Sequence, residues 1–133
     1  MPRKRLTYKG RTEHGSGGFF GLPHAVMASP SFRGLSAHAV KLLCDIGGQY
    51  RGKNNGDLCA TWRVMQRLGW RSRDTLSRAL RELLGAGLIE LTRQGGLNRC
   101  SLYALTWRSI DDCKGKLDVL PTIKPSGLWK RAA

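Results

Sequence analysis

Apolar residues in the middle of the chain recur at helical spacing in two blocks separated by a glycine. The longer block repeats every three or four residues, which predicts a helix with one apolar stripe. The stripe consists of Leu76, Ala79, Leu80, Leu83 and Leu84. Ser72 occupies the expected N-cap, and Asp74 lies in the first turn, where a carboxylate stabilises the positive end of the helix. Gly85 is the expected left-handed terminator, so the pattern marks both ends of this helix.

The shorter block predicts a helix over residues 61–68, with Val64, Met65 and Leu68 as its inward positions. Gly69 follows and permits a sharp turn, which would set the two helices at a steep angle. The two blocks together predict a helix-turn-helix.

Two β-type runs follow the second helix, at residues 88–93 and 99–107, and the polar residues 94–98 between them predict a hairpin. Tyr103, Leu105 and Trp107 share one face at period two, so we expect that face to pack on the helices. The tip of the hairpin is left free and polar.

The residues before this region predict two further helices. Pro23 is expected to open a brief helix through Met27, which Ser29-Pro30 would end. Ser36 caps a stronger pattern, which Gly47-Gly48 weakens. The inward positions of this pattern are Ala39, Val40, Leu43 and Ile46. Residues 57–59 are expected to form a short strand that joins the hairpin.

The charge of the chain indicates a class of binding partner. The chain has 133 residues, enough for one domain, with a net charge of +14 and a pI of about 10.6, so a polyanion is the expected partner. The stretch from Arg63 to Arg99 contains eight arginines and no lysine, but only three carboxylates. The planar guanidinium suits guanine edges and phosphates, although a GC-rich genome would also enrich arginine.

Several chemistries are excluded by spacing. The cysteines are scattered, with no Cys-x-x-Cys pair, and the histidines complete no metal set, so we expect no metal, no cofactor and a reducing cytoplasm. The cysteines are Cys44, Cys59, Cys100 and Cys113. The neighbouring Asp111 and Asp112 would point apart, and no nucleotide-binding loop or catalytic triad motif is present. No run approaches membrane-spanning length. We therefore expect neither an enzyme nor a membrane protein.

Three segments are expected along the chain: a flexible basic arm over residues 1–18, a folded domain over 19–107 and a basic tail over 108–133. The arm carries Arg3, Lys4 and Arg5, which would lie along phosphates or serve solubility alone. The tail would either lie across the domain or dock on a protein partner. Its possible anchors on the domain are Val119, Leu120 and Trp129.

The helix-turn-helix and hairpin pattern resembles the winged helix-turn-helix superfamily over residues 35–107. The matching positions are Leu68, Gly69, Trp70, Ser72, Thr75, Leu76, Ala79, Leu80, Leu83, Gly87, Leu88, Ile89 and the hairpin end Leu102-Tyr103-Ala104-Leu105-Thr106. It is similar to the small winged-helix proteins and replication-protein N-terminal domains of phages and plasmids. The implied fold is mainly α with a small β-hairpin wing, an α+β class. Trp70 departs from the pattern, because a smaller aliphatic residue is usual there.

The resemblance implies a sequence-specific protein for double-stranded DNA, with residues 72–84 in the major groove and the wing, residues 88–107, on the backbone. By position, base reading would fall to Arg73, Asp74, Ser77 and Arg78. Phosphate contacts would fall to Arg71, Thr75, Arg81, Arg93, Gln94 and Arg99. The implied role is a transcription regulator or replication accessory of a bacterial mobile element, bound at the nucleoid. A homodimer stays open, and the alternative is an adaptor or inhibitor that docks on a nucleoprotein complex.

Overall fold

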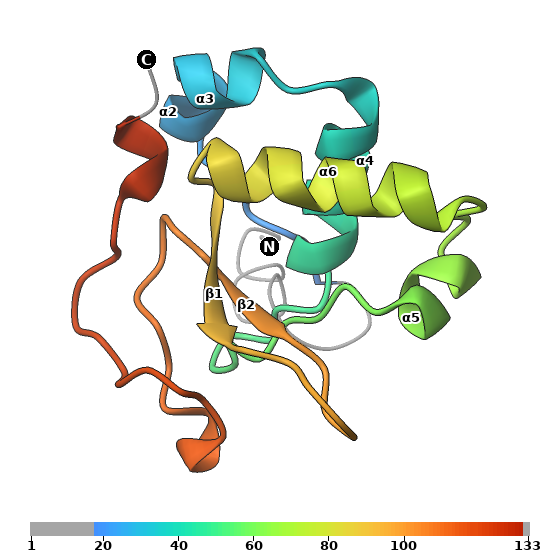
Figure 1. Ribbon diagram of the computed structural model, residues 1–133. Helices are drawn as coiled ribbons and strands as arrows, with labels where there is room; N and C mark the ends of the chain where they lie inside the picture. Colours follow the sequence, from blue (N-terminus) through green and yellow to red (C-terminus); the bar gives the residue numbers. More distant parts are fainter. Residues whose placement is uncertain (1–17, 132–133) are drawn as a thin grey trace, which may run out of the picture.

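The computed structural model describes residues 18–131, and in this part of the chain five α-helices accompany one antiparallel hairpin (Figure 1). The class is therefore α+β, as predicted. The elements in order are α2 (His24–Met27), α3 (Pro30–Arg33), α4 (Ala37–Gly47), α5 (Trp62–Arg67), α6 (Arg73–Gly85), β1 (Ile89–Arg93), β2 (Leu102–Leu105) and the 3₁₀ turns η1 (Cys113–Gly115) and η2 (Leu128–Lys130).

The three longer helices begin at hydroxyl caps. Ser36 Oγ accepts from the Ala39 N–H at 3.2 Å at the start of α4, and Ser72 Oγ accepts in the same way at the start of α6. Thr61 Oγ1 caps α5. Each hydroxyl satisfies a backbone donor that has no partner within its helix, which explains where the helices begin. The caps predicted at Ser36 and Ser72 are confirmed.

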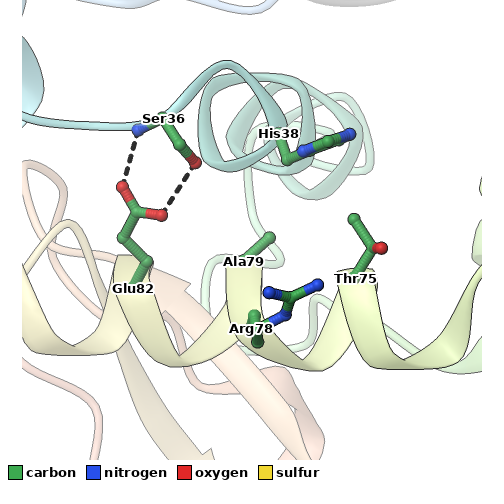
Figure 2. Close-up of a pocket in the computed structure, with 6 residues that line it drawn as sticks. All are labelled: Ser36, His38, Thr75, Arg78, Ala79 and Glu82. Carbon is green, nitrogen blue, oxygen red and sulfur yellow. Dashed lines mark hydrogen bonds between the residues drawn. The ribbon is translucent and has the colours of Figure 1, made fainter.

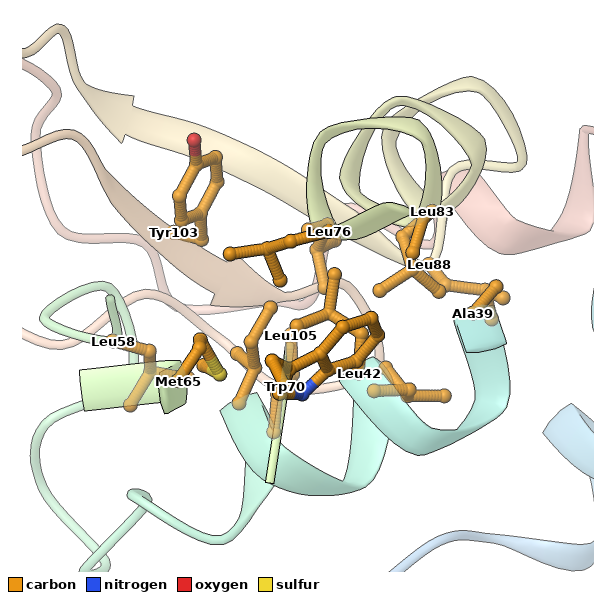
Figure 3. Close-up of a cluster of buried hydrophobic side chains, with 14 of the residues drawn as sticks. Ala39, Leu42, Leu58, Met65, Trp70, Leu76, Leu83, Leu88, Tyr103 and Leu105 are labelled. Atoms are coloured by element: carbon orange, nitrogen blue, oxygen red, sulfur yellow. The ribbon is translucent and has the colours of Figure 1, made fainter. Parts of the chain in front are cut away.

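The core lies between α4, α6 and the hairpin (Figure 3). Its fully buried side chains include Leu42, Leu43, Ile46, Leu58, Met65, Leu83, Leu88, Ile89 and Leu105. In α6 the stripe is narrower than predicted, because Leu76, Ala79 and Leu83 are buried whereas Leu84 is 36% exposed. Leu84 therefore lies at the edge of the core.

Trp70 explains a second difference between prediction and structure. Leu68, expected to face inward from the first helix, is 43% exposed, whereas Trp70 is 5% exposed and lies within the apolar cluster in Figure 3. The indole Nε1–H donates to Asp45 Oδ2 at 2.8 Å, so its polar atom is satisfied at the edge of the core. Gly69, at φ +103°, makes the turn that directs the larger side chain inward.

The end of α6 also differs from the prediction. Gly85 belongs to the helix and Ala86 after it is still right-handed, so the left-handed residue is Gly87 at φ +76°. A Cβ on Gly87 would lie 2.6 Å from the Leu128 carbonyl oxygen. The close approach of the C-terminal stretch therefore selects glycine two residues later than local pattern alone suggests.

The hairpin pairs Ile89 with Leu105 and Leu91 with Tyr103, with a bulge between Leu91 and Arg93. Both strands are shorter than predicted, because β1 begins at Ile89 and β2 covers only Leu102–Leu105. Leu58 forms an antiparallel bridge to Tyr103, so the predicted third strand is present as a single bridge. Tyr103 and Leu105 are buried, as expected, and Trp107 is half-buried against the cluster.

Two predictions about the flanking segments need correction. Ser29-Pro30 ends α2 but also begins α3, since Ser29 Oγ accepts from the Phe32 N–H at 3.3 Å. Pro23 is the N-cap of α2 and not its first helical residue.

The C-terminal stretch runs beside the hairpin to α3 (Figure 1). Ser31 Oγ donates to the Trp129 carbonyl at 2.5 Å, and the Gly127 N–H donates to the Thr106 carbonyl at 2.9 Å. Trp129 packs against the core cluster, whereas Val119 and Leu120 are 40% and 83% exposed and are not part of that cluster.

Candidate nucleic-acid interface

The face of α6 opposite its buried stripe carries the residues that the resemblance assigns to base reading. Arg73, Asp74, Ser77 and Arg78 are all exposed. They share this face because helical residues three or four apart lie on one side, and Leu76, Ala79 and Leu83 occupy the other. The structure therefore brings the four residues together on one solvent-facing surface.

Arg78 is paired within this surface. Its Nη2 lies 3.2 Å from Asp74 Oδ2, one turn earlier, and the two side chains are 66% and 76% exposed. An exposed pair of this kind contributes only about 0–1 kcal/mol. Arg78 is thus extended along the helix by Asp74 and can exchange that carboxylate for another acceptor at small cost.

Arg73 is held by an aromatic ring from the neighbouring helix. Its guanidinium carbon lies 5.4 Å from the centroid of the Trp62 ring. This cation–π contact connects α5 to the start of α6 and orients Arg73 without neutralising its charge. Trp62 is therefore a supporting residue of the candidate interface.

The basic surface extends from α6 over α5 and the turn. Arg63, Arg67, Arg71 and Arg81 are exposed, and none of them takes part in an ion pair with another residue of the 18–131 range. Arg71 and Arg81 were predicted, whereas Arg63 and Arg67 were not selected. The run of arginines without lysine was the signal that included them.

An open groove of about 370 Å³ separates α4 from this surface (Figure 2). Its lining residues are Ser36, His38, Thr75, Arg78, Ala79 and Glu82. Glu82 closes one end, because its carboxylate accepts from Ser36 N–H at 2.6 Å and from Ser36 Oγ–H at 2.8 Å. Thr75 is half-buried in the groove wall, so of the predicted phosphate contacts on α6 it is less accessible than Arg81.

The three predicted phosphate contacts of the wing are close together and already engaged. Arg93 donates from Nε and Nη2 to the Cys100 carbonyl at 3.1 and 2.8 Å. Arg99 donates from the same two atom types to the Gln94 carbonyl at 3.1 and 3.0 Å. These bonds join the two arms of the wing at the base of its tip.

A carboxylate from the C-terminal stretch completes this cluster. Asp118 Oδ2 accepts from the Gln94 N–H at 2.8 Å, and Asp118 Oδ1 lies 3.1 Å from Arg99 Nη2. The Gln94 hydrogen bond, with help from Arg99, holds the pKa of Asp118 below its ordinary value. These two donors of the hairpin tip therefore already hold a carboxylate of the same chain.

The remaining predicted features give no further site. Arg3, Lys4 and Arg5 lie outside the described residues. Within residues 18–131 no group of three metal-ligating side chains is found, and the four cysteines are free thiols. Burial raises the pKa of the Cys44 and Cys113 thiols. No helix in this part of the chain is long and apolar enough to cross a membrane.

Comparisons of the chain with protein-family models, curated proteins and solved structures found no match. The candidate interface therefore rests on its own geometry and charge.

Proposed function

We propose that this protein is a winged helix-turn-helix protein that binds double-stranded DNA, with α6 in the major groove and the wing against the backbone. The order of elements supports the fold: α4, the Leu58 bridge, α5, a glycine turn, α6 and a hairpin follow one another as this fold requires. The observation that carries the function is the exposed arginine face of α6.

That face fits a major groove in size and chemistry. A helix of 13 residues is about 20 Å long, and the groove of B-DNA, about 12 Å wide, admits one helix. Arginine bidentate to guanine is the commonest specific contact, and Arg78 and Arg73 present exposed guanidinium groups from the first two turns. Ser77 between them adds a hydroxyl that can donate or accept.

The surrounding cations fit the phosphate backbone. Arg63, Arg67 and Arg71 flank the start of α6 and keep their charges unpaired within the described part of the chain. Arg99 and the Gln94 N–H on the wing already hold a carboxylate, which shows that they can bind an anionic oxygen. Transcription regulation and replication control, the two roles implied by the resemblance, would both begin with this binding step.

The proposal is tested by measuring duplex affinity against salt concentration. If about 5 phosphates are contacted, log K should fall with log salt at a slope of roughly −0.9 per phosphate. Replacing Arg73, Arg78 and Arg81 together by alanine should reduce both affinity and slope. The matched control replaces Lys53, Lys114 and Lys124, which are exposed and outside α5, α6 and the hairpin.

A slope near zero, or equal losses in the two triple variants, would reject α6 as the DNA-contacting helix. In that case the same arginines would be better explained by an acidic protein partner, as in the adaptor alternative.

A further inference from the structure

The C-terminal stretch places one carboxylate on the part of the wing that the proposed function assigns to DNA phosphate. Both Asp118 oxygens are used: Oδ2 by the Gln94 N–H at 2.8 Å, and Oδ1 by Arg99 Nη2 at 3.1 Å. An aspartate and a phosphodiester both offer two anionic oxygens to such donors. The carboxylate and a DNA phosphate would therefore compete for the same atoms.

We propose that Asp118 fills the phosphate site of the wing in the free protein, and that a backbone phosphate of bound DNA displaces it. This inference rests on the proposed function and adds a regulatory contact to it. The site consists of the Gln94 N–H and the Arg99 guanidinium, and its ligand class is a phosphate monoanion.

The donors stay in place when Asp118 leaves, because other bonds fix the wing. The Gly96 and Arg99 backbones form a reciprocal bridge at 3.0 and 3.2 Å, and the Gly95 N–H donates to Ser101 Oγ at 2.9 Å. Arg99 keeps its two bonds to the Gln94 carbonyl. The site is thus preorganised without the carboxylate.

The backbone that carries Asp118 is held on both sides, so only the Asp118 side chain needs to move. Leu117 lies against Gly56, and Thr122 exchanges hydrogen bonds with Ile110 at 2.9 and 2.8 Å. The Asp118 N–H donates to the Thr92 carbonyl at 2.8 Å, which fixes the backbone but leaves the side chain able to rotate away. Displacement therefore requires a change of one exposed side chain and no rearrangement of the core.

The test compares duplex binding of wild type, Asp118→Ala and Asp112→Ala at low salt. Asp112 is the matched control, because it lies exposed in the same stretch and its side chain has no hydrogen bond or ion pair to any residue of the 18–131 range. Asp118→Ala should tighten binding by about two- to five-fold, the range that one exposed ion pair supports. Asp112→Ala, which removes the same charge, should change affinity much less.

A second comparison places both alanine substitutions in an Arg99→Ala background. The gain from Asp118→Ala should shrink there, since the Arg99 guanidinium, one of the two donors for which Asp118 and phosphate compete, is gone. If Asp118→Ala and Asp112→Ala change duplex affinity equally in the parent protein, the change reflects net charge alone and the proposal is overturned. Weaker binding by Asp118→Ala would overturn it as well, because Asp118 would then brace the wing for DNA.

A DNA-independent measurement separates this inference from the proposed function. Titration of ¹⁵N-labelled protein with inorganic phosphate should shift the Gln94 amide signal at a lower concentration in Asp118→Ala than in wild type. Coincident titration curves would overturn the proposal that Asp118 fills this site. If no variant binds duplex but the Gln94 curves still differ, the proposed function fails and the anion site stands.

Discussion

Asn55 is a polar side chain at the centre of the fold, and it connects the loop before Leu58 to the end of the hairpin. It is fully buried, its Oδ1 accepts from the Leu105 N–H at 2.8 Å, and its Nδ2 donates to the carbonyls of Leu105, Arg108 and Ser109 at 2.9 to 3.2 Å. A buried amide with its bonds satisfied stabilises a fold, whereas its removal leaves buried donors and acceptors unpaired.

Replacement of Asn55 by alanine should therefore lower the free energy of unfolding by about 2–4 kcal/mol. Denaturant unfolding measures this loss, and Lys53→Ala, an exposed change in the same loop, serves as the control. A loss below about 0.5 kcal/mol, the usual effect of a surface change, would show that the network does not stabilise the domain.

Trp70 shows what a residue pattern can and cannot predict. The sequence identified it as unusual for its position, and the structure gives the reason: its ring takes the core place expected for Leu68, while Asp45 receives its N–H. Leu68 and Trp70 are both apolar and adjacent to Gly69, so periodicity alone could not choose between them. The positive φ of Gly69 directs Trp70, and not Leu68, into the core.

At the scale of elements, the starts of α4 and α6 were predicted correctly, whereas the end of α6 was not. Ser36 and Ser72 are caps whose hydroxyls bond within three residues, so the sequence contains the whole interaction. The end of α6 depends on Leu128, which lies far along the chain. The same applies to the bulge in β1, next to Thr92, whose hydroxyl donates to the Gly56 carbonyl at 2.6 Å.

Glu82 determines how α4 and α6 meet, because its carboxylate binds both donors of Ser36 (Figure 2). Charge-assisted bonds at a helix start are stronger than neutral ones, but this pair is exposed to solvent. Glu82→Ala should therefore cost about 1 kcal/mol of unfolding free energy, and Glu82→Gln less, since the amide keeps one acceptor. If Glu82→Ala and Glu82→Gln melt at the same temperature as wild type, the Glu82–Ser36 contact does not stabilise the packing of the two helices.

At the scale of the molecule, the C-terminal stretch closes the fold in a way that no local pattern shows. The Ser31 to Trp129 hydrogen bond joins residues 98 positions apart, and η2 lies against α3. The sequence left two interpretations of this stretch open, packing on the domain or docking on a partner. The structure shows packing through Trp129 and the buried Ile110.

Trp129→Ala should lower the free energy of unfolding by about 1–3 kcal/mol, less than a fully buried aromatic would, because the ring is half-buried. Leu120→Ala, a change at an 83% exposed side chain, should leave stability within about 0.5 kcal/mol. Thermal and denaturant unfolding of the pair measure the contrast. Equal effects would mean that the stretch does not stabilise the domain through its tryptophan.

The candidate site was predictable to the extent that it lies on one helix. The exposed face of α6 follows from its apolar stripe, so Arg73, Asp74, Ser77 and Arg78 were placed together from the sequence. The support of Arg73 by Trp62 and the binding of Asp118 to the wing depend on contacts between elements. Such contacts cannot be read from spacing along the chain.

Whether α6 reads bases is tested most directly by comparing the sequence preference of wild type with that of Arg78→Ala. Sites are first selected from a random duplex pool, and binding curves are then measured on selected and scrambled duplexes. Arg78→Ala should cost about 1–3 kcal/mol on the selected site and relax the choice of base at one position. Arg99→Ala should instead weaken both duplexes alike and reduce the salt slope by about 1. An unchanged sequence preference in folded Arg78→Ala protein would contradict base reading by α6.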